Sequence, residues 1–254
     1  MDRRALKFPF TLDSAPDWMC PTCGKAPLRI RKDSFSKEER SHSRNHSHEA
    51  WEPEWIEYVY SCMLICSNDQ CKEAVASSGI GSVDWSIEED EHGVPDQLYE
   101  DHFRPKFFQP HLKIFQIPDD CPESVSMPLE DSFALFFAAP HAASNNVRIA
   151  IEALLTELKI RRFVLSGGKR RFVSLHQRIA LLPPKYPHLK DLILAIKWLG
   201  NAGSHDGGDE VSLDDVMDSY ELTEHILQEV YAPKLEKLHK LAKKVNKKKG
   251  PAKK

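Results

Sequence analysis

The chain has 254 residues, of which 41% are hydrophobic and 29% are charged, and its formal net charge is −3. This length allows one large domain or two small ones with a buried core. No run approaches the roughly 18 apolar residues of a transmembrane helix, and the N-terminus lacks the apolar stretch of a secretory signal. We therefore expect a cytoplasmic protein without a membrane partner.

The small net charge hides an asymmetry between the two halves of the chain. Residues 1–120 carry 14 basic and 22 acidic side chains, a net charge of −8, whereas residues 121–254 have a net charge of +5. Nine lysines and no acidic residue lie in 237–254. Without this tail the second half is not a broadly basic surface, so contact with a polyanion has to come from the tail or from local patches.

Residues 1–118 favour a small β-rich unit. The run 55–66 is rich in β-branched and aromatic residues and predicts a strand, with 74–85 as its antiparallel partner. The glycines in this partner indicate a bulge or a close backbone approach, and Pro110 places a third strand, 106–117, at a sheet edge. Two polar stretches are expected to be solvated loops: 34–50 and 88–101.

Two pairs of cysteines in this unit have the spacing of a metal site. Cys20 and Cys23 are two residues apart and precede a glycine, and Cys66 and Cys71 flank a polar turn between the first two strands. Two thiolate pairs on adjacent turns supply the tetrahedral sulfur ligands that Zn²⁺ prefers, and a disulfide is the poorer explanation in a reducing cytoplasm. We predict structural zinc, because four thiolates leave no open position for a substrate.

The remaining thiols and histidines of this half have simpler explanations. Cys62 alternates with apolar strand residues, and we interpret it and Cys121 as small buried side chains. His42, His46 and His48 could bind metal, but a polar loop with incidental histidines is the favoured interpretation.

Prolines at 118, 122 and 128 mark the change to a helical half. Apolar residues at helical spacing predict helices over 129–139, 141–160, 174–182 and 189–200. A last helix begins at Ser212, where Asp215 completes a capping box, and runs toward Pro233. The expected fold is α+β: a zinc-ribbon-like β module in 1–118, an up-and-down bundle of four or five helices in 119–236, and a disordered lysine-rich tail in 237–254.

Two features of the helical half carry a family resemblance. One helix stops at Gly200-Asn201 and is followed by His205, and an earlier helix carries Arg148 and Glu152 four residues apart. Together these resemble the helical domain of unknown function found in bacterial restriction-associated and anti-phage defence proteins, a branch of the HEPN superfamily. The resemblance covers about the last half of the chain and implies a HEPN-like bundle that forms a homodimer.

RNases of this superfamily carry an arginine that is separated by four to six residues from a histidine at a helix end, and two copies join these motifs without a metal. His205 matches the histidine and would act as acid or base. The arginine is missing, and the nearest preceding basic residue is Lys197. The candidate catalytic residues are His205, Lys197, Arg148, Glu152 and Asn201. Alternatively, His205 only bonds a neighbouring group and Arg148 pairs with Glu152 along the helix, and the missing arginine favours a structural or binding role over an endoribonuclease.

A second basic feature flanks the Gly167-Gly168 turn. These residues are candidate nucleic-acid contacts, although a solvated loop is the commoner explanation: Arg161, Arg162, Lys169, Arg170 and Arg171. The lysine tail could bind nucleic acid or only aid solubility. We therefore expect a component of a bacterial defence, restriction-associated or toxin-type system that binds RNA, another nucleic acid or a partner protein of the same operon. DNA recognition by the acidic N-terminal module is disfavoured.

Overall fold

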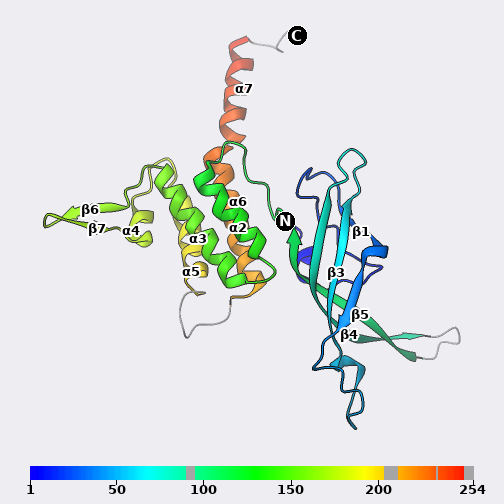
Figure 1. The fold of residues 1–254 in the computed structure, drawn as a ribbon. Helices are drawn as coiled ribbons and strands as arrows, with labels where there is room; N and C mark the ends of the chain where they lie inside the picture. The colour runs from blue at the N-terminus through cyan, green and yellow to red at the C-terminus, as the bar shows by residue number, and fades with distance from the viewer. Residues whose placement is uncertain (90–94, 203–210, 233, 249–254) are drawn as a thin grey trace. The chain divides into compact units, whose positions relative to one another are not determined.

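A computed structural model of the chain describes residues 1–89, 95–202, 211–232 and 234–248. Its contacts divide the chain into two compact units (Figure 1). The first comprises Met1–Lys113 and Phe133–Ala139, and the second comprises Ile114–Ser132 and Pro140–Lys254. The first is built mainly of strands and the second mainly of helices, so the expected α+β class is confirmed. Among the described residues, no helix has the length and apolar character that crossing a membrane requires.

The first unit contains a five-stranded antiparallel sheet in the order β1-β3-β4-β5, with β2 also paired to β3. Its strands are β1 (Leu28–Ile30), β2 (Ser36–Glu39), β3 (Glu57–Cys66), β4 (Ala74–Glu89) and β5 (Pro95–Gln109). Three short helices accompany it: α1 (Arg3–Lys7), η1 (Lys32–Ser34) and η2 (Pro53–Trp55).

An aromatic core lies against one face of this sheet. Successive side chains of a strand point to opposite faces, and in β3 the even-numbered residues from Tyr60 to Cys66 are the buried ones. Phe10 packs edge-on against Trp18, with ring centroids 5.2 Å apart, and against Tyr60, at 5.6 Å. The Tyr60 hydroxyl lies 3.2 Å from the Ser77 hydroxyl, so this buried polar group is satisfied.

The predicted β3–β4 pair is confirmed, and so is the irregularity at its glycines. The β4–β5 register shifts between Ser78 and Gly79. A Cβ atom added at Gly79 would lie 2.2 Å from the carbonyl oxygen of Arg104. This is too close for any side chain, so only glycine fits at this position. The backbone of β5 therefore approaches β4 more closely here than any side chain allows.

Three expectations for this unit are wrong. The polar stretch 34–50 contains β2, and much of the acidic stretch 88–101 belongs to the strands of the β4–β5 hairpin. Cross-strand pairs such as Trp85 opposite Tyr99 outweigh the acidic composition there. The third strand covers Pro95–Gln109 instead of 106–117, because Pro110 has no N–H to donate and the ladder ends before it.

The second unit consists of helices and one hairpin. The helices are α2 (Glu123–Leu135), α3 (Pro140–Glu157), α4 (Leu175–Ala180), α5 (Leu189–Ala202), α6 (Leu213–Tyr231) and α7 (Lys234–Lys248). The hairpin strands are β6 (Phe163–Ser166) and β7 (Lys169–Phe172).

Helices α3, α5 and α6 pack on one another, and α4 packs on α5. Their apolar stripes are buried at Leu154, Ile193 and Leu227 among others, at the helical spacing seen in the sequence. The capping box predicted at Ser212 and Asp215 is confirmed, and a second one at Ser174 and Gln177 begins α4.

Helix α2 covers Glu123–Leu135 instead of the expected 129–139, and two further features of this unit also differ from expectation. Helix α5 does not stop at Gly200 but continues through Ala202. The lysine-rich tail is not disordered over its described part, because 234–248 form α7. Lysine, leucine and alanine are strong helix formers, and the apolar residues of this segment recur at helical spacing.

Candidate functional site

The four paired cysteines come from two separate turns of the β unit. Cys20 and Cys23 lie in a turn closed by the Gly24 N–H, which donates to the Cys20 carbonyl oxygen at 2.9 Å; Gly24 has a φ of +60°. Cys66 is the last residue of β3. Cys71 closes the turn after it, because the Cys71 N–H donates to the Asn68 carbonyl oxygen at 2.9 Å. The two turns therefore present their sulfurs from fixed backbone positions.

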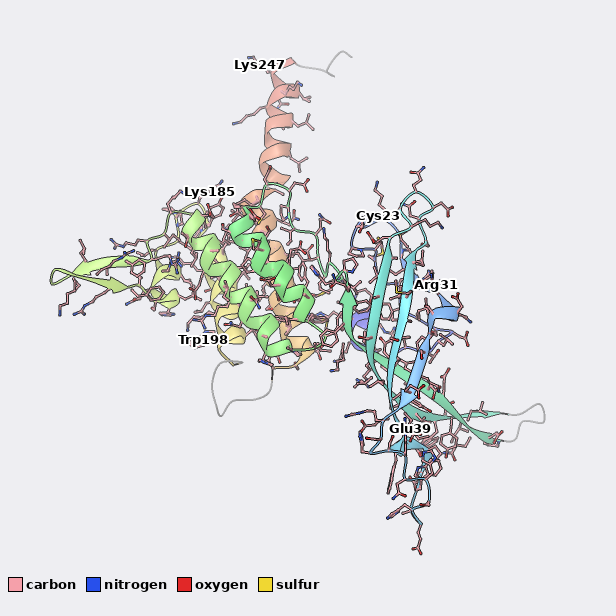
Figure 2. All side chains as sticks on the ribbon, viewed as in Figure 1. Cys23, Arg31, Glu39, Lys185, Trp198 and Lys247 are labelled. Atoms are coloured by element: carbon pink, nitrogen blue, oxygen red, sulfur yellow. The ribbon has the colours of Figure 1, made fainter. Side chains whose placement is uncertain are left out.

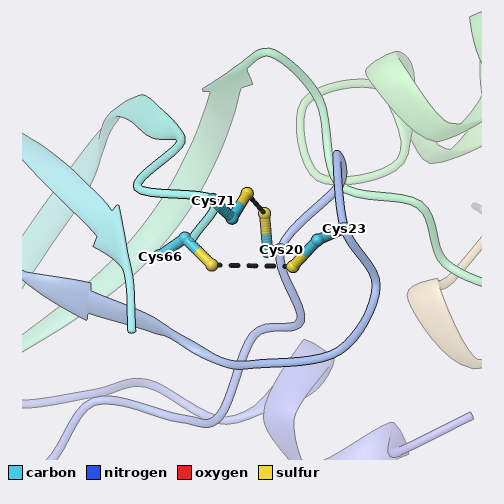
Figure 3. Close-up of side chains that lie close together, drawn as sticks. All are labelled: Cys20, Cys23, Cys66 and Cys71. Carbon is cyan, nitrogen blue, oxygen red and sulfur yellow. Dashed lines mark hydrogen bonds between the residues drawn. The ribbon is translucent and has the colours of Figure 1, made fainter. Parts of the chain in front are cut away.

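The four sulfurs lie together, as Figure 3 shows. Sγ of Cys20 is 3.8 Å from Sγ of Cys71, Sγ of Cys23 is 3.7 Å from Sγ of Cys66, and all four lie within 4.8 Å of one another. A tetrahedral ion with metal–sulfur bonds of about 2.3 Å has sulfur–sulfur edges of about 3.8 Å. A disulfide needs about 2.05 Å, and all four thiols are free. The arrangement is therefore compatible with one four-sulfur metal site.

The surroundings of the cluster stabilise thiolates unequally. The Lys25 N–H donates to Sγ of Cys23 and lowers the pKa of that thiol to about 6. Burial raises the pKa of Cys66 to about 12, against the Asn68 N–H, which lies 3.5 Å from its sulfur. A cation at the centre would hold all four as thiolates, which is how such sites bind metal.

The other thiols and the histidines stand apart from this cluster. Cys62 is buried on β3 as predicted, whereas Cys121 is only partly buried. His46 lies 2.9 Å from a carboxylate oxygen of Glu39, and His42 lies 3.1 Å from one of Glu57. Within the described residues, the four cysteines are the one group of three or more His, Cys, Asp or Glu side chains placed to share an ion.

The basic residues around the Gly167-Gly168 turn form a hairpin instead of the loop expected from the sequence. Both glycines have positive φ, +59° and +73°, as a two-residue hairpin turn requires. All five predicted contacts are exposed: Arg161, Arg162, Lys169, Arg170 and Arg171. The hairpin projects from the helices in Figure 1. The sequence carries a further signal for this basic segment, since residues 158–190 hold nine basic and no acidic residues.

One face of the hairpin combines aromatic and basic groups. Phe163 and Phe172 face each other across the strands with ring centroids 5.7 Å apart, and Phe172 is 55% exposed. The Arg170 guanidinium lies 3.8 Å from the Phe163 ring centre, a cation–π contact. Leu165, on the same face, is 81% exposed. These apolar groups have no core to enter, so they are available to a ligand.

The candidate catalytic residues are only partly described. Arg148 pairs with Glu152 along α3, Nε to Oε1 at 3.4 Å, as the alternative interpretation holds. Its side chain also packs on α5, because a Cβ added at Gly200 would lie 3.1 Å from Cβ of Arg148. The Lys197 ammonium sits over the Trp198 ring, 3.4 Å from its centre.

His205 lies outside the described residues, and Asn201 is placed only as a backbone position in α5. The distance between His205 and Arg148, which would test the RNase motif, therefore stays a prediction. Arg148 is nevertheless brought to the end of α5 from which the chain runs toward His205.

One buried cation of the helical unit was not predicted from the sequence. Arg178 of α4 is fully buried. Its guanidinium donates to the carbonyl oxygens of Glu152 (3.0 Å) and Ile160 (3.2 Å) and to the Thr156 hydroxyl (2.8 Å). Burial lowers the pKa of Arg178 below its usual value, and the nearby Glu152 charge opposes this. This side chain therefore ties α4 to the end of α3.

Comparison with known proteins found two domain families. Residues 8–108 match a domain of unknown function (DUF8608), which spans the sheet and the four cysteines. Residues 130–248 match a second domain of unknown function (DUF4145), which spans the helices from the middle of α2 to the end of α7. No match was found among the curated proteins or among the solved structures.

Proposed function

We propose that this protein binds single-stranded nucleic acid, RNA foremost, through the β6–β7 hairpin, and that a structural Zn²⁺ ion holds its N-terminal unit together. The observation that carries the binding function is the exposed ribbon of arginine, lysine and phenylalanine in a segment without acidic residues. The family resemblance noted above suggests a HEPN-like component of a bacterial defence, restriction-associated or toxin-type system as its setting.

The chemistry of the hairpin favours single strands over duplexes. Arginine and lysine neutralise phosphates irrespective of sequence, and exposed aromatic rings stack on unpaired bases. Phe172 supplies a ring, while Arg170 and Arg171 point to opposite faces of β7. A strand running along the ribbon can thus meet a base-stacking group and phosphate-binding groups together. A duplex would offer no unstacked base to Phe172.

Zinc is the metal we propose for the four cysteines. Sulfur ligands in tetrahedral geometry are typical of structural zinc, and two of the ligands, Cys20 and Cys66, are buried. Thr22 and Glu73 reinforce the site, because the Thr22 hydroxyl of one turn donates to the Glu73 carboxylate of the other at 2.5 Å. With all four positions filled by sulfur, the ion would stabilise the fold and take no part in catalysis.

Removing two charges from the hairpin is expected to weaken RNA binding. The Arg170→Gln/Arg171→Gln protein should bind a fluorescein-labelled single-stranded RNA about tenfold more weakly and lose about 1.4 from the slope of log affinity against log salt, because two phosphate contacts are removed. Phe172→Ala should lose about 1–3 kcal/mol of binding free energy as one stacking ring is lost. Fluorescence anisotropy of the full chain at several salt concentrations measures both.

The matched control is Arg29→Gln/Arg31→Gln, which makes the same charge change at exposed positions in the β unit. Its RNA affinity should stay within about twofold of the unaltered protein. Equal losses in both double variants would show that only the net charge matters. Absence of binding even at low salt would reject the proposed function.

A second candidate function, metal-independent RNA cleavage, is favoured by the packing of Arg148 against Gly200. In that case the protein should cut RNA without Mg²⁺ and leave 2′,3′-cyclic phosphate ends. His205→Ala should abolish the cleavage, and Arg148→Ala should reduce it at least about tenfold if the guanidinium steadies the phosphate. Intact RNA after prolonged incubation, with and without Mg²⁺, would leave binding as the sole activity.

A further inference from the structure

The distal parts of β4 and β5 form a two-stranded arm that the functions above do not use. The pairing of β3 with β4 ends at Ser82, so among the described residues 83–89 and 95–101 have only each other as strand partners. Figure 1 shows this arm running past the end of β3, and its side chains are drawn in Figure 2. Two strands without a third are only marginally stable in water. A further strand along the arm would therefore stabilise it.

The open edge of this arm belongs to β5. Phe103 and Phe10 exchange both of their backbone hydrogen bonds, at 2.7 Å and 2.9 Å, so the backbone groups of Phe103 face away from β4. Because the backbone groups of alternate strand residues point the same way, those of Tyr99 and Gln97 face the same edge. No described backbone group pairs with them there, whereas β4 is contacted by η2. An exposed edge of this kind accepts an extended peptide by strand addition.

The arm has an aromatic face and an acidic face. Trp85 lies opposite Tyr99 on the first, and these residues are 47% and 48% exposed. On the second, Asp84 lies opposite Glu100, and like charges in this position destabilise a strand pair. Asp84 accepts the Trp85 N–H at 2.9 Å, and Glu100 lies 3.8 Å from Nε2 of His102. Neither carboxylate has a lysine or arginine partner in the described part of the chain, so a cation from outside would relieve their repulsion.

The charge of the arm has one sign. Residues 84–101 hold eight acidic residues and no lysine or arginine, and the rest of 1–120 holds 14 acidic and 14 basic residues. One of the eight, Asp101, pairs with the Lys37 ammonium. A second copy of this edge would carry the same negative charge, and the basic segment 234–248 of this chain is helical, so neither supplies a basic extended strand. The arm therefore fits a cationic partner.

We infer that the β5 edge binds an extended segment of a partner protein in which several consecutive residues are lysine or arginine. Side chains of an added strand alternate between the two faces of the arm. On one face they would meet the Tyr99 ring, with Trp85 behind it, and aromatic rings bind cations. On the other face they would meet the carboxylate of Glu100. Both faces favour positive charge, so a run of basic residues fits better than a strand that alternates basic and apolar residues.

Fluorescence anisotropy with a fluorescein-labelled peptide of eight alternating arginine and lysine residues tests this inference on the full chain. Gln97→Pro removes one outward N–H, places ring carbons in the path of an added strand and alters no charge. Proline is tolerated at a sheet edge, so the fold should persist while peptide binding weakens at least about tenfold. Gln97→Ala keeps the N–H and is the matched control, which should bind within about twofold of the unaltered protein. Neither variant should change the RNA affinity.

A second pair of variants separates binding from folding. Asp84→Asn/Glu100→Gln removes the opposed carboxylates, so the tryptophan fluorescence melting temperature should stay unchanged or rise. Peptide binding in low salt should nevertheless weaken at least about fivefold. Glu49→Gln/Glu52→Gln, which removes two exposed acidic residues elsewhere in the β unit, is the matched control and should bind within about twofold. This pair carries the test alone if Gln97→Pro does not fold.

Three results would overturn the inference. One is absence of peptide binding in low salt at about 100 µM protein. Another is an equal loss of binding in folded Gln97→Pro and Gln97→Ala proteins, which would exclude strand addition. The third is an equal loss in the two double variants, which would reduce the binding to unspecific attraction by the net charge of the unit.

Discussion

The Cys66→Ser protein is expected to lose the proposed zinc ion and the cooperative unfolding of the β unit, while the helical unit stays folded. Cys66 is fully buried at the end of β3, and its Sγ lies 3.7 Å from Sγ of Cys23, which comes 43 residues earlier in the chain. A hydroxyl does not replace a thiolate as a zinc ligand, so the ion should leave and three thiols remain around an empty centre. Structural zinc sites have apparent binding free energies of about 10–16 kcal/mol, more than the net stability of a small domain.

Two spectroscopic signals separate the units in this experiment. Four of the five tryptophans lie in residues 1–113, so tryptophan fluorescence reports mainly the β unit, whereas circular dichroism at 222 nm reports mainly the helices. The matched control is Cys62→Ala, a buried thiol of the same strand outside the cluster. It should keep one metal per chain and lose only about 1 kcal/mol. A Cys66→Ser protein with unchanged metal content and unchanged fluorescence melting would contradict the assignment.

Arg178→Ala is expected to destabilise the helical unit by about 3 kcal/mol. The guanidinium is fully buried and donates to the carbonyl oxygens of Glu152 and Ile160. Truncation leaves the Ile160 carbonyl without this partner and opens a cavity between α3 and α4. Arg178→Lys keeps the charge but cannot donate in three directions from a planar fork, so it should recover only part of the loss.

Urea unfolding followed at 222 nm measures this effect in the full chain. Arg171→Ala, an exposed arginine of the neighbouring hairpin, is the control and should change the unfolding free energy by no more than about 0.5 kcal/mol. Equal stabilities of the Arg178→Ala and Arg171→Ala proteins would show that the buried guanidinium is dispensable for packing. A loss of stability seen only in tryptophan fluorescence would show that Arg178→Ala acts on the β unit, which would contradict this prediction.

Local patterns in the sequence were sufficient for much of the fold. The richness in β-branched and aromatic residues identified the β3–β4 pair, apolar spacing identified α3, α5 and α6, and the Ser212 cap set the start of α6. The long β4–β5 hairpin was missed because its acidic composition hides the cross-strand pairs that stabilise it. The tail was predicted disordered from its charge, although its leucines have helical spacing and 234–248 form α7.

Some residues of the candidate sites could be predicted from local sequence patterns, and others depend on how the helices pack. Short spacing in the chain predicted the two cysteine pairs, and the β3–β4 pair that presents Cys66 and Cys71 was also predicted. The pairing of β1 with β3, which places Leu28 opposite Cys66, was not predicted. The role of Arg178 could not be predicted, because its partners on α3 and the loop after it lie 18 to 26 residues away and depend on packing. The contact of Arg148 with Gly200 likewise arises from helix packing and has no signature in the sequence.

X-ray absorption at the zinc edge, combined with native mass spectrometry of the purified chain, tests most directly whether two distant turns share a single ion. We expect one zinc per chain surrounded by four sulfur atoms at about 2.3 Å, and loss of that ion on denaturation. Nitrogen or oxygen ligands around the ion, or a folded metal-free chain in which the same cysteines are joined as disulfides, would contradict it.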